Sequence, residues 1–228
     1  MTRGKKIALG CLGVFLLAAI IFVFSARRFI FPEKLDVVSI RTESTFQNPA
    51  LLQRAFALPV AAQYQRAPIA FQPNGSFCGP TSLADVWRTL GRPEVTPAQV
   101  LEGTELCATG ICFGGLTLDD LAGVVRNRIH RRATVLRNLN LAQFREHLRH
   151  SNEPDRRYVL NFDRGPLFGT RGGHHSPVGG YLEGEDLVLV LDVNARFRPW
   201  LVRSARLFQA MDTTDQGTGR KRGLLLIQ

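Results

Sequence analysis

The chain has 228 residues, of which 45% are hydrophobic and 21% are charged, enough for one globular domain with an ordinary core. Its 29 Lys and Arg residues outnumber its 19 Asp and Glu residues, and the net charge of +10 favours anionic ligands. The densest basic run, Arg126 to Arg137, has no interleaved aromatic residues and matches no nucleic-acid motif, so we expect no nucleic-acid partner. Four scattered cysteines are too few for a disulfide scaffold.

The amino terminus combines basic residues with a long apolar run. Arg3, Lys5 and Lys6 precede Ile7 to Ala26, a stretch without a charged residue that is long enough to span a bilayer as a helix. The sequence therefore predicts a single-pass membrane anchor within residues 1–28. The basic residues before the span favour an amino terminus in the cytoplasm and the rest of the chain outside it, which in a bacterium is the periplasm.

A segment with spaced prolines follows the apolar run. We interpret residues 29–65 as a tether that contains a short helix from Pro49 to Phe56, and residues 66–228 as the folded domain. The start of that domain can fall anywhere between about residue 35 and residue 65, because boundaries are the least certain part of such an interpretation.

The stretch from Phe71 to Gly91 places a cysteine at the start of a predicted helix. A turn rich in Gly, Asn and Pro leads to Cys78, and apolar residues follow at helical spacing. The free N–H groups and the positive end of the helix dipole favour a thiolate over a thiol, which makes the sulfur a better nucleophile. Cysteine is also often buried for packing alone, so this position does not by itself establish catalysis.

The remaining elements change from helices to strands along the chain. Capping patterns predict helices that begin near Thr96 and Thr117, and the apolar spacing from Asn140 to His150 predicts a third amphipathic helix. Runs rich in Val, Leu and aromatic residues then predict three strands, at Arg157 to Asp163, Ser176 to Leu182 and Asp186 to Val193. A helix from Val202 to Met211 and a final strand from Arg222 to Gln228 follow. Helices first and an antiparallel sheet second indicate an α+β fold.

A histidine and an aspartate come together if the predicted hairpin forms. His174 lies at the start of one strand and Asp192 at the end of the next, with a turn at residues 183–185 between them. An imidazole held by a carboxylate is an oriented base for a thiol, and the order Cys78, His174, Asp192 is that of papain-like enzymes. The alternatives are a solvated histidine and a turn-forming aspartate. His175 should point to the opposite face from His174, so that only one ring reaches the thiol.

Several motifs in order resemble the phytochelatin synthase family, which has a papain-like catalytic domain. They are QPNGSFCGPTSL, GHHSPVGGYLEGEDLVLVLDV, the Trp200-Leu201-Val202 segment, Ala210-Met211 and TGRKRGLLLI, against family motifs that read roughly CGxxSL, GHFSPIGGY and LILDVARF. The resemblance covers the chain from about Pro68 to its end. It implies a papain-like cysteine-enzyme fold after the amino-terminal transmembrane helix.

The resemblance also implies roles for four residues in a reaction of glutathione. Cys78 would attack the carbonyl between cysteine and glycine, release glycine and keep a γ-glutamylcysteinyl thioester. His174 would serve as general base and acid, and Asp192 would orient it. Gln72, six residues before Cys78, would donate to the oxyanion together with the backbone N–H of Cys78; its alternative is an ordinary loop residue.

The segment after Asp192 departs from the family pattern. It has one residue more than DVARF, and His175 replaces the family's aromatic residue after the catalytic histidine. An arginine there would bind a glutathione carboxylate, since a guanidinium suits this group, and the insertion leaves Arg196 and Arg198 as alternatives beside a structural role.

Cys107 and Cys112, the two cysteines of LCATGICFGG, could form a disulfide with each other or bind a metal ion. Outside the cytoplasm they would form a small disulfide, which we favour, and in a reducing compartment they could bind a thiophilic metal. We expect no built-in metal cofactor. A heavy metal ion such as Cd, Zn or Cu would act as part of a metal-glutathione substrate, as the family resemblance implies.

The leading hypothesis is a membrane-anchored enzyme that passes a γ-glutamylcysteinyl group to a second glutathione, which gives phytochelatins for heavy-metal detoxification, or to water. A papain-like peptidase is the first alternative, and the GGY that follows GHHSP argues against it. A non-catalytic metal or thiol binder is the second, and the intact set of Cys78, His174, Asp192 and Gln72 argues against it. The sequence leaves open whether the chain forms a homodimer.

Overall fold

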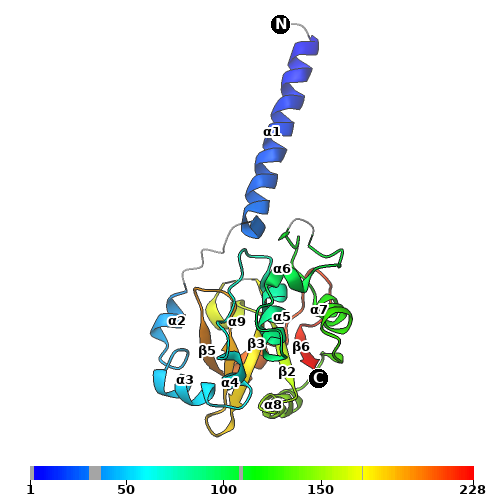
Figure 1. The fold of residues 1–228 in the computed structure, drawn as a ribbon. Coiled ribbons are helices and arrows are strands. Elements are labelled where there is room, and N and C mark those ends of the chain that lie inside the picture. Colours follow the sequence, from blue (N-terminus) through cyan, green and yellow to red (C-terminus); the bar gives the residue numbers. More distant parts are fainter. Residues whose placement is uncertain (1–2, 31–36, 108–109, 171) are drawn as a thin grey trace.

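The computed structural model describes residues 3–30, 37–107, 110–170 and 172–228 (Figure 1). The helices are α1 (Arg3–Ile30), α2 (Val38–Thr42), α3 (Pro49–Phe56), α4 (Ala61–Tyr64), α5 (Cys78–Thr89), α6 (Pro97–Val100), α7 (Leu118–Val124), the π-helix η2 (Val125–Ile129), α8 (Leu141–His150), α9 (Gly165–Phe168), the 3₁₀ turn η3 (Glu183–Glu185) and α10 (Ser204–Met211). The strands are β1 (Ala133–Leu136), β2 (Arg157–Asp163), β3 (Gly173–Leu182), β4 (Leu187–Leu191), β5 (Pro199–Arg203) and β6 (Gly223–Ile227).

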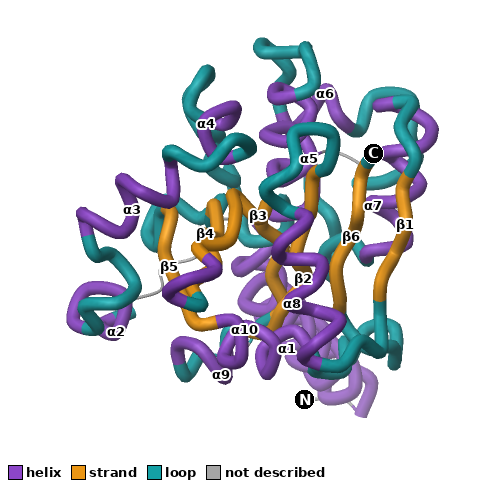
Figure 2. Tube along the Cα trace, turned by 90° about the horizontal axis from the view of Figure 1, so that it is seen from below, coloured by secondary structure: helices purple, strands orange, loops and turns teal. Residues whose placement is uncertain are grey.

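The six strands form one antiparallel sheet in the order β1-β6-β2-β3-β4-β5. Figure 2 shows the sheet with helices on both sides, which confirms the α+β class predicted from the sequence. Strands β2, β3 and β6 occupy the centre of the sheet, and β3 carries the predicted base His174.

Alternation along the strands produces two hydrophobic cores, one on each face of the sheet. In β4, Leu187, Leu189 and Leu191 face the core that α3, α5 and α7 cover, whereas Val188 and Val190 face the core under α8 and α10. Both faces of a strand are apolar only where both faces are covered, and the unbroken sequence LVLVL reflects this burial.

The folded body begins at the early end of the range expected from the sequence and includes much of the predicted tether. Val37, Ile40 and Phe46 are buried in the core under α8 and α10, and α3 packs Ala55 into the other core. Residues from Val37 onward are therefore part of the fold, and the assignment of 29–65 to a tether is wrong for this part. The segment lacks a long periodic pattern because its helices are short and each buries only one or two side chains. Residues 31–36 lie outside the described residues.

The amino-terminal helix α1 extends away from the sheet and its helices (Figure 1). Within the described part of the chain, no helix is sufficiently long and apolar to cross a membrane. The structure thus does not support the transmembrane helix expected at Ile7 to Ala26. The periplasmic location stays a prediction that the structure does not test.

The predicted hairpin is present, and the elements beside it differ from the prediction. β3 and β4 pair across η3, as expected. Residues 199–203 form the edge strand β5 paired with β4, so the helix expected from Val202 begins two residues later at Ser204. β1 was not predicted, because it lies within a basic run and its side chains are only partly buried.

Candidate active site

Cys78 is the first residue of α5, as the sequence predicts, and its side chain is buried. The turn before it is held by Asn74, whose Oδ1 accepts hydrogen bonds from the backbone N–H of Ser76 at 3.0 Å and from its hydroxyl at 2.7 Å. Within the first turn of α5, the Ser82 hydroxyl donates a hydrogen bond to the carbonyl of Cys78 at 2.8 Å. The sulfur is thus fixed at the positive end of a helix, where a thiolate is stabilised.

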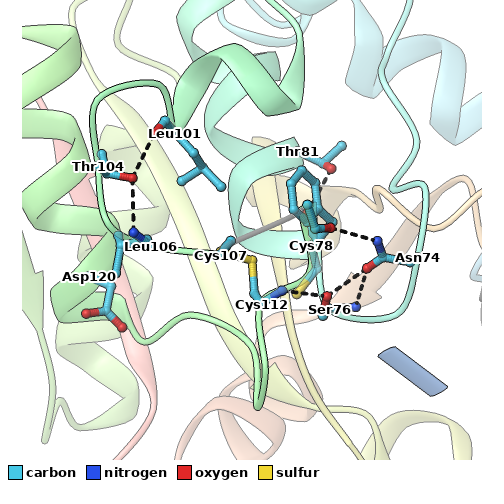
Figure 3. Close-up of a disulfide and its surroundings, with 12 residues drawn as sticks. Asn74, Ser76, Cys78, Thr81, Leu101, Thr104, Leu106, Cys107, Cys112 and Asp120 are labelled. Carbon is cyan, nitrogen blue, oxygen red and sulfur yellow. Dashed lines mark hydrogen bonds between the residues drawn. A yellow bond between two sulfur atoms is a disulfide. The ribbon is translucent and has the colours of Figure 1, made fainter. Parts of the chain in front are cut away.

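A disulfide loop is attached to this turn. Cys107 and Cys112 form a disulfide with an S–S distance of 2.01 Å. The N–H of Cys112 donates to the Ser76 hydroxyl at 3.1 Å, and the Asn74 side-chain amide donates to the Gly110 carbonyl at 3.2 Å. Figure 3 shows the disulfide beside Cys78 and the Asn74–Ser76 turn. The loop therefore supports the segment that presents the nucleophile.

His174, near the start of β3, pairs with Asp192, which follows β4. The His174 Nε2 lies 2.9 Å from the Asp192 Oδ1, and both side chains are buried. The same carboxylate accepts from the backbone N–H of Asn194 at 2.9 Å and from the Trp200 indole at 3.1 Å, and Arg164 lies 3.5 Å from it. A carboxylate with this many donors is held in one orientation and fixes the ring that donates to it.

These contacts determine the ionisation of Asp192. Burial raises the pKa of its carboxyl, but the positive charges of His174 and Arg164 and the donated hydrogen bonds outweigh burial and lower that pKa to about 2. Because the ionised carboxylate can only accept hydrogen bonds, the Nε2 of His174 must carry a proton. The Nδ1 of the neutral ring is then free to act as a base.

Cys78 and His174 shift each other toward an ion pair. Burial raises the pKa of the Cys78 thiol, but hydrogen bonds to His174 and His175 outweigh burial and hold that pKa well below its usual range. Burial and Arg164 lower the pKa of His174, but the charge and hydrogen bond of Asp192 and the bond to Cys78 leave it raised. These directions favour a thiolate beside an imidazolium.

His175 also reaches the sulfur, so the expectation that only one histidine can do so is wrong. Its Nδ1 lies 3.7 Å from the Cys78 Sγ. Pairing with β2 sets His175 opposite Asn161 and His174 opposite Phe162, on the two faces of the sheet. Although the two rings start from opposite faces of β3, both contribute to lowering the pKa of the Cys78 thiol.

Gln72 lies in the turn that leads to Cys78. Its backbone N–H donates to the Val193 carbonyl at 2.8 Å, which brings it beside the Asp192 segment. Its side-chain N–H donates to the Asn74 carbonyl at 3.0 Å, and its Oε1 is buried without a partner among the described residues. The amide is therefore close to the turn of the nucleophile.

Arg196 and Arg198 lie in the turn after Asp192 with exposed side chains. The Arg196 backbone donates to the Asn194 side chain at 3.0 Å, and Arg198 has a positive φ of 56°. This geometry orients the turn and leaves both guanidinium groups at the surface. It does not distinguish between the two as substrate ligands.

Sequence reasoning missed the polar residues that support the site from β2 and β6. Asn161 and Arg164 are buried at the end of β2, and Arg222 is buried just before β6. The signal was present, because Asn161 interrupts the apolar strand RYVLNFD and a buried polar side chain needs a partner. Among the described residues, no group of three or more His, Cys, Asp or Glu is placed to hold a metal ion.

Comparison with known proteins gives a consistent assignment. The family model described as "Phytochelatin synthase" matches residues 31–224. The chain is 35% identical over 173 residues to "Glutathione gamma-glutamylcysteinyltransferase 1" of Triticum aestivum, covering 68% of this chain and 33% of that protein. It is 31% identical over 221 residues to "Glutathione gamma-glutamylcysteinyltransferase 2" of Arabidopsis thaliana, covering 88% of this chain and 46% of that protein. The chain thus spans a third to just under half of these relatives' lengths.

A solved structure supports the fold. A C39-like peptidase from Bacillus anthracis superposes with a TM-score of 0.52 at 14% identity, covering 71% of this chain and 94% of that one. At this identity the likeness concerns the fold alone. It agrees with the papain-like cysteine-enzyme fold expected from the sequence.

Proposed function

Since the chain belongs to the phytochelatin synthase family, we propose that it is a cysteine acyltransferase that acts on glutathione. The observation that carries this proposal is the convergence of Cys78, His174 and Asp192 in one buried cluster, with the pKa of the thiol lowered and that of the imidazole raised. Such a cluster supplies a nucleophile, a proton carrier and a group that orients the carrier.

The first half-reaction forms a thioester. The Cys78 thiolate attacks the carbonyl carbon between the cysteine and glycine of glutathione, and a C–S bond forms. The tetrahedral intermediate then collapses, the C–N bond breaks, and the His174 imidazolium gives its proton to the departing amine. Glycine leaves and the γ-glutamylcysteinyl group stays on the sulfur.

The oxyanion of this intermediate needs hydrogen-bond donors. The backbone N–H of Cys78 is available at the start of α5, where the first N–H groups of a helix have no partner within it. The Gln72 amide, which lies in the adjoining turn, is the second donor. A donor of this kind contributes about 3 kcal/mol to the transition state of comparable enzymes.

The second half-reaction transfers the acyl group. His174, now neutral, removes a proton from the amine of a second glutathione or from water, and the acceptor attacks the thioester carbonyl. The sulfur leaves as a thiolate. The product is a phytochelatin in the first case and γ-glutamylcysteine in the second.

Charge supports an anionic substrate. The chain has a formal net charge of +10, and Arg196 and Arg198 are exposed on the segment that follows Asp192. A guanidinium there binds a carboxylate of glutathione. A heavy metal ion such as Cd, Zn or Cu enters as part of the acceptor, bound to the thiolates of glutathione.

The test is mass spectrometry of the products after the full chain is incubated with glutathione, with and without Cd²⁺ or Zn²⁺. We expect glycine with γ-glutamylcysteine, (γ-Glu-Cys)₂-Gly with metal, or both, and we expect Cys78→Ala to abolish every product. Unchanged glutathione under all conditions would overturn the proposal. The papain-like peptidase would then be the function to test next, with peptide substrates.

A further inference from the structure

The imidazole of His175 is close to the nucleophile and has no role in the reaction described above. It is buried, its Nδ1 lies 3.7 Å from the Cys78 Sγ, and its other ring nitrogen faces Asn161. Its pairing partner Asn161 continues the face of β2 on which Val159 packs toward α5. The ring thus stands between the nucleophile and a buried amide.

The orientation of the Asn161 amide follows from its other neighbour. The Arg222 Nη1 lies 3.0 Å from the Asn161 Oδ1. A guanidinium can only donate hydrogen bonds, so the amide oxygen must face Arg222 and the amide nitrogen must face His175. The Asn161 Nδ2 lies 2.7 Å from the His175 Nε2 and 3.5 Å from its Nδ1, so the amide bonds to Nε2.

This orientation determines the tautomer of His175. The amide NH₂ can only donate, and so the Nε2 of the ring must accept with its lone pair. In the neutral ring the proton is then on Nδ1, the nitrogen that faces the sulfur. His174 has the opposite arrangement, because Asp192 accepts from its Nε2 and leaves its Nδ1 as a base.

Arg222 is itself fixed. Its Nη1 lies 3.0 Å from the Asp215 Oδ2, and the side chain is buried. Its guanidinium lies directly over Gly173, where a Cβ would overlap with it. The glycine of the GHHSP motif therefore makes room for the group that orients Asn161.

We propose that His175 is a second catalytic residue that donates its Nδ1–H to the Cys78 thiolate, and that Asn161 is a positioning residue that fixes this tautomer. The role deepens the proposed function and rests on Cys78 being the nucleophile. The Nδ1–H of His175 would stabilise the Cys78 thiolate at two stages, before the sulfur attacks and when it leaves the thioester. The charged and titratable groups around this pair are His174, Asp192, Arg164, Arg222 and Asp215.

The first test measures the reactivity of Cys78 without glutathione. The rate of alkylation by iodoacetamide is followed on the peptide that contains Cys78, between pH 5 and pH 9, in the wild type, His175→Phe and His175→Gln. A hydrogen bond to a charged group is worth enough to shift thiol ionisation by about one pH unit. We therefore expect the pH at which alkylation reaches half its maximal rate to rise by about one unit in His175→Phe, with an equal rate once the thiol is fully ionised.

Rescue separates donation from mere packing. His175→Gln keeps a side-chain N–H and should reverse most of this shift in the pH profile, whereas His150→Gln, a change outside the site, should leave the profile unchanged. A rate within twofold of the wild type for His175→Phe at every pH would overturn the proposal. Because glutathione is absent, these results are independent of whether the proposed transferase activity is correct.

The second test observes the tautomer directly in the intact protein. Nitrogen-15 spectra of the histidine rings at pH 8 should show His175 protonated at Nδ1 in the wild type. In Asn161→Asp the new carboxylate accepts from the ring, so the proton should move to Nε2 and alkylation at pH 6 should slow. A wild-type His175 protonated at Nε2 alone would contradict the proposal, even if every variant folded poorly.

Discussion

The backbone N–H of Gln72 donates to the carbonyl of Val193 at 2.8 Å and joins two segments that are far apart in the sequence. One segment leads to Cys78 at the start of α5, and the other follows Asp192 at the end of β4. The bond links the helical part of the molecule, which supplies the nucleophile, to the sheet, which supplies the base. It belongs to the backbone and is kept by every substitution of Gln72 that leaves a backbone N–H.

Gln72→Ala should therefore remove a donor without separating the two segments. We expect kcat to fall by about 10²-fold, as for the loss of one oxyanion donor, with little change in KM. Steady-state release of glycine from glutathione measures both constants. Gln99→Ala, which removes a side chain from the exposed cap of α6, is the matched control. A kcat within twofold of the wild type would exclude Gln72 from the oxyanion site.

Asp192→Asn should reduce activity by roughly 10³- to 10⁴-fold, because an amide neither stabilises the imidazolium of His174 nor holds its tautomer. The pKa of His174 should fall and that of Cys78 should rise. Alkylation of Cys78 at pH 6 and glycine release measure these two effects. Asp212→Asn, at a surface ion pair with Lys221, should change neither.

The same carboxyl should affect stability in acid. Its pKa of about 2 in the folded chain is below the ordinary value of 3.8, so its contribution is fully present above about pH 4 and is lost as the pH falls toward 2. Urea unfolding between pH 6 and pH 2 should show a steeper loss of stability for the wild type than for Asp192→Asn. Parallel curves for the two proteins would contradict the lowered pKa.

Cys112→Ser should destabilise the protein and weaken the nucleophile. Opening a short disulfide loop removes about 2 kcal/mol by the chain-entropy relation, and the loop also binds Ser76 and Asn74 in the turn before Cys78. We expect a lower Tm and slower alkylation of Cys78. A reducing agent should have the same effect on the wild type and none on the variant. Cys11→Ser, at an exposed free cysteine, is the control.

Arg196→Ala and Arg198→Ala, made singly, test which guanidinium binds substrate. Loss of the arginine that contacts a carboxylate should raise KM for glutathione about tenfold and leave kcat nearly unchanged, because an exposed charged contact stabilises bound substrate and transition state equally. Arg203→Ala, exposed at the end of β5, is the control. KM values for all three variants that equal the wild-type KM would exclude both arginines from the substrate site.

The sequence was sufficient for the parts of the site that depend on local patterns. A turn rich in Gly and Asn followed by helical periodicity locates Cys78, and a hairpin with its turn at residues 183–185 brings His174 to Asp192. The capping patterns at Thr96 and Thr117 likewise appear as complete capping boxes. Each of these signals involves residues close together in the chain or joined by one turn.

The remaining features depend on contacts between distant segments. Asn161 reaches His175 across a strand pair, and Arg222 reaches Asn161 from the residue before the last strand, so neither contact has a local signature. Strand alternation predicts opposite faces for His174 and His175, but it cannot show that the sulfur lies where both rings reach it. The helix Pro49–Phe56 was predicted with the observed bounds, but its packing into the fold, like that of α2 and α4, was missed because this burial depends on the sheet beneath.

The proposed mechanism requires Cys78 to carry the γ-glutamylcysteinyl group between donor and acceptor. Its most direct test is an acid-quenched reaction of the intact protein with excess glutathione, in which the peptide that contains Cys78 is weighed by mass spectrometry. We expect a gain of one γ-glutamylcysteinyl group on that peptide, one glycine released per group in the first turnover, and neither in Cys78→Ala. Glycine released without any acyl group on Cys78, or by the Cys78→Ala variant, would contradict it.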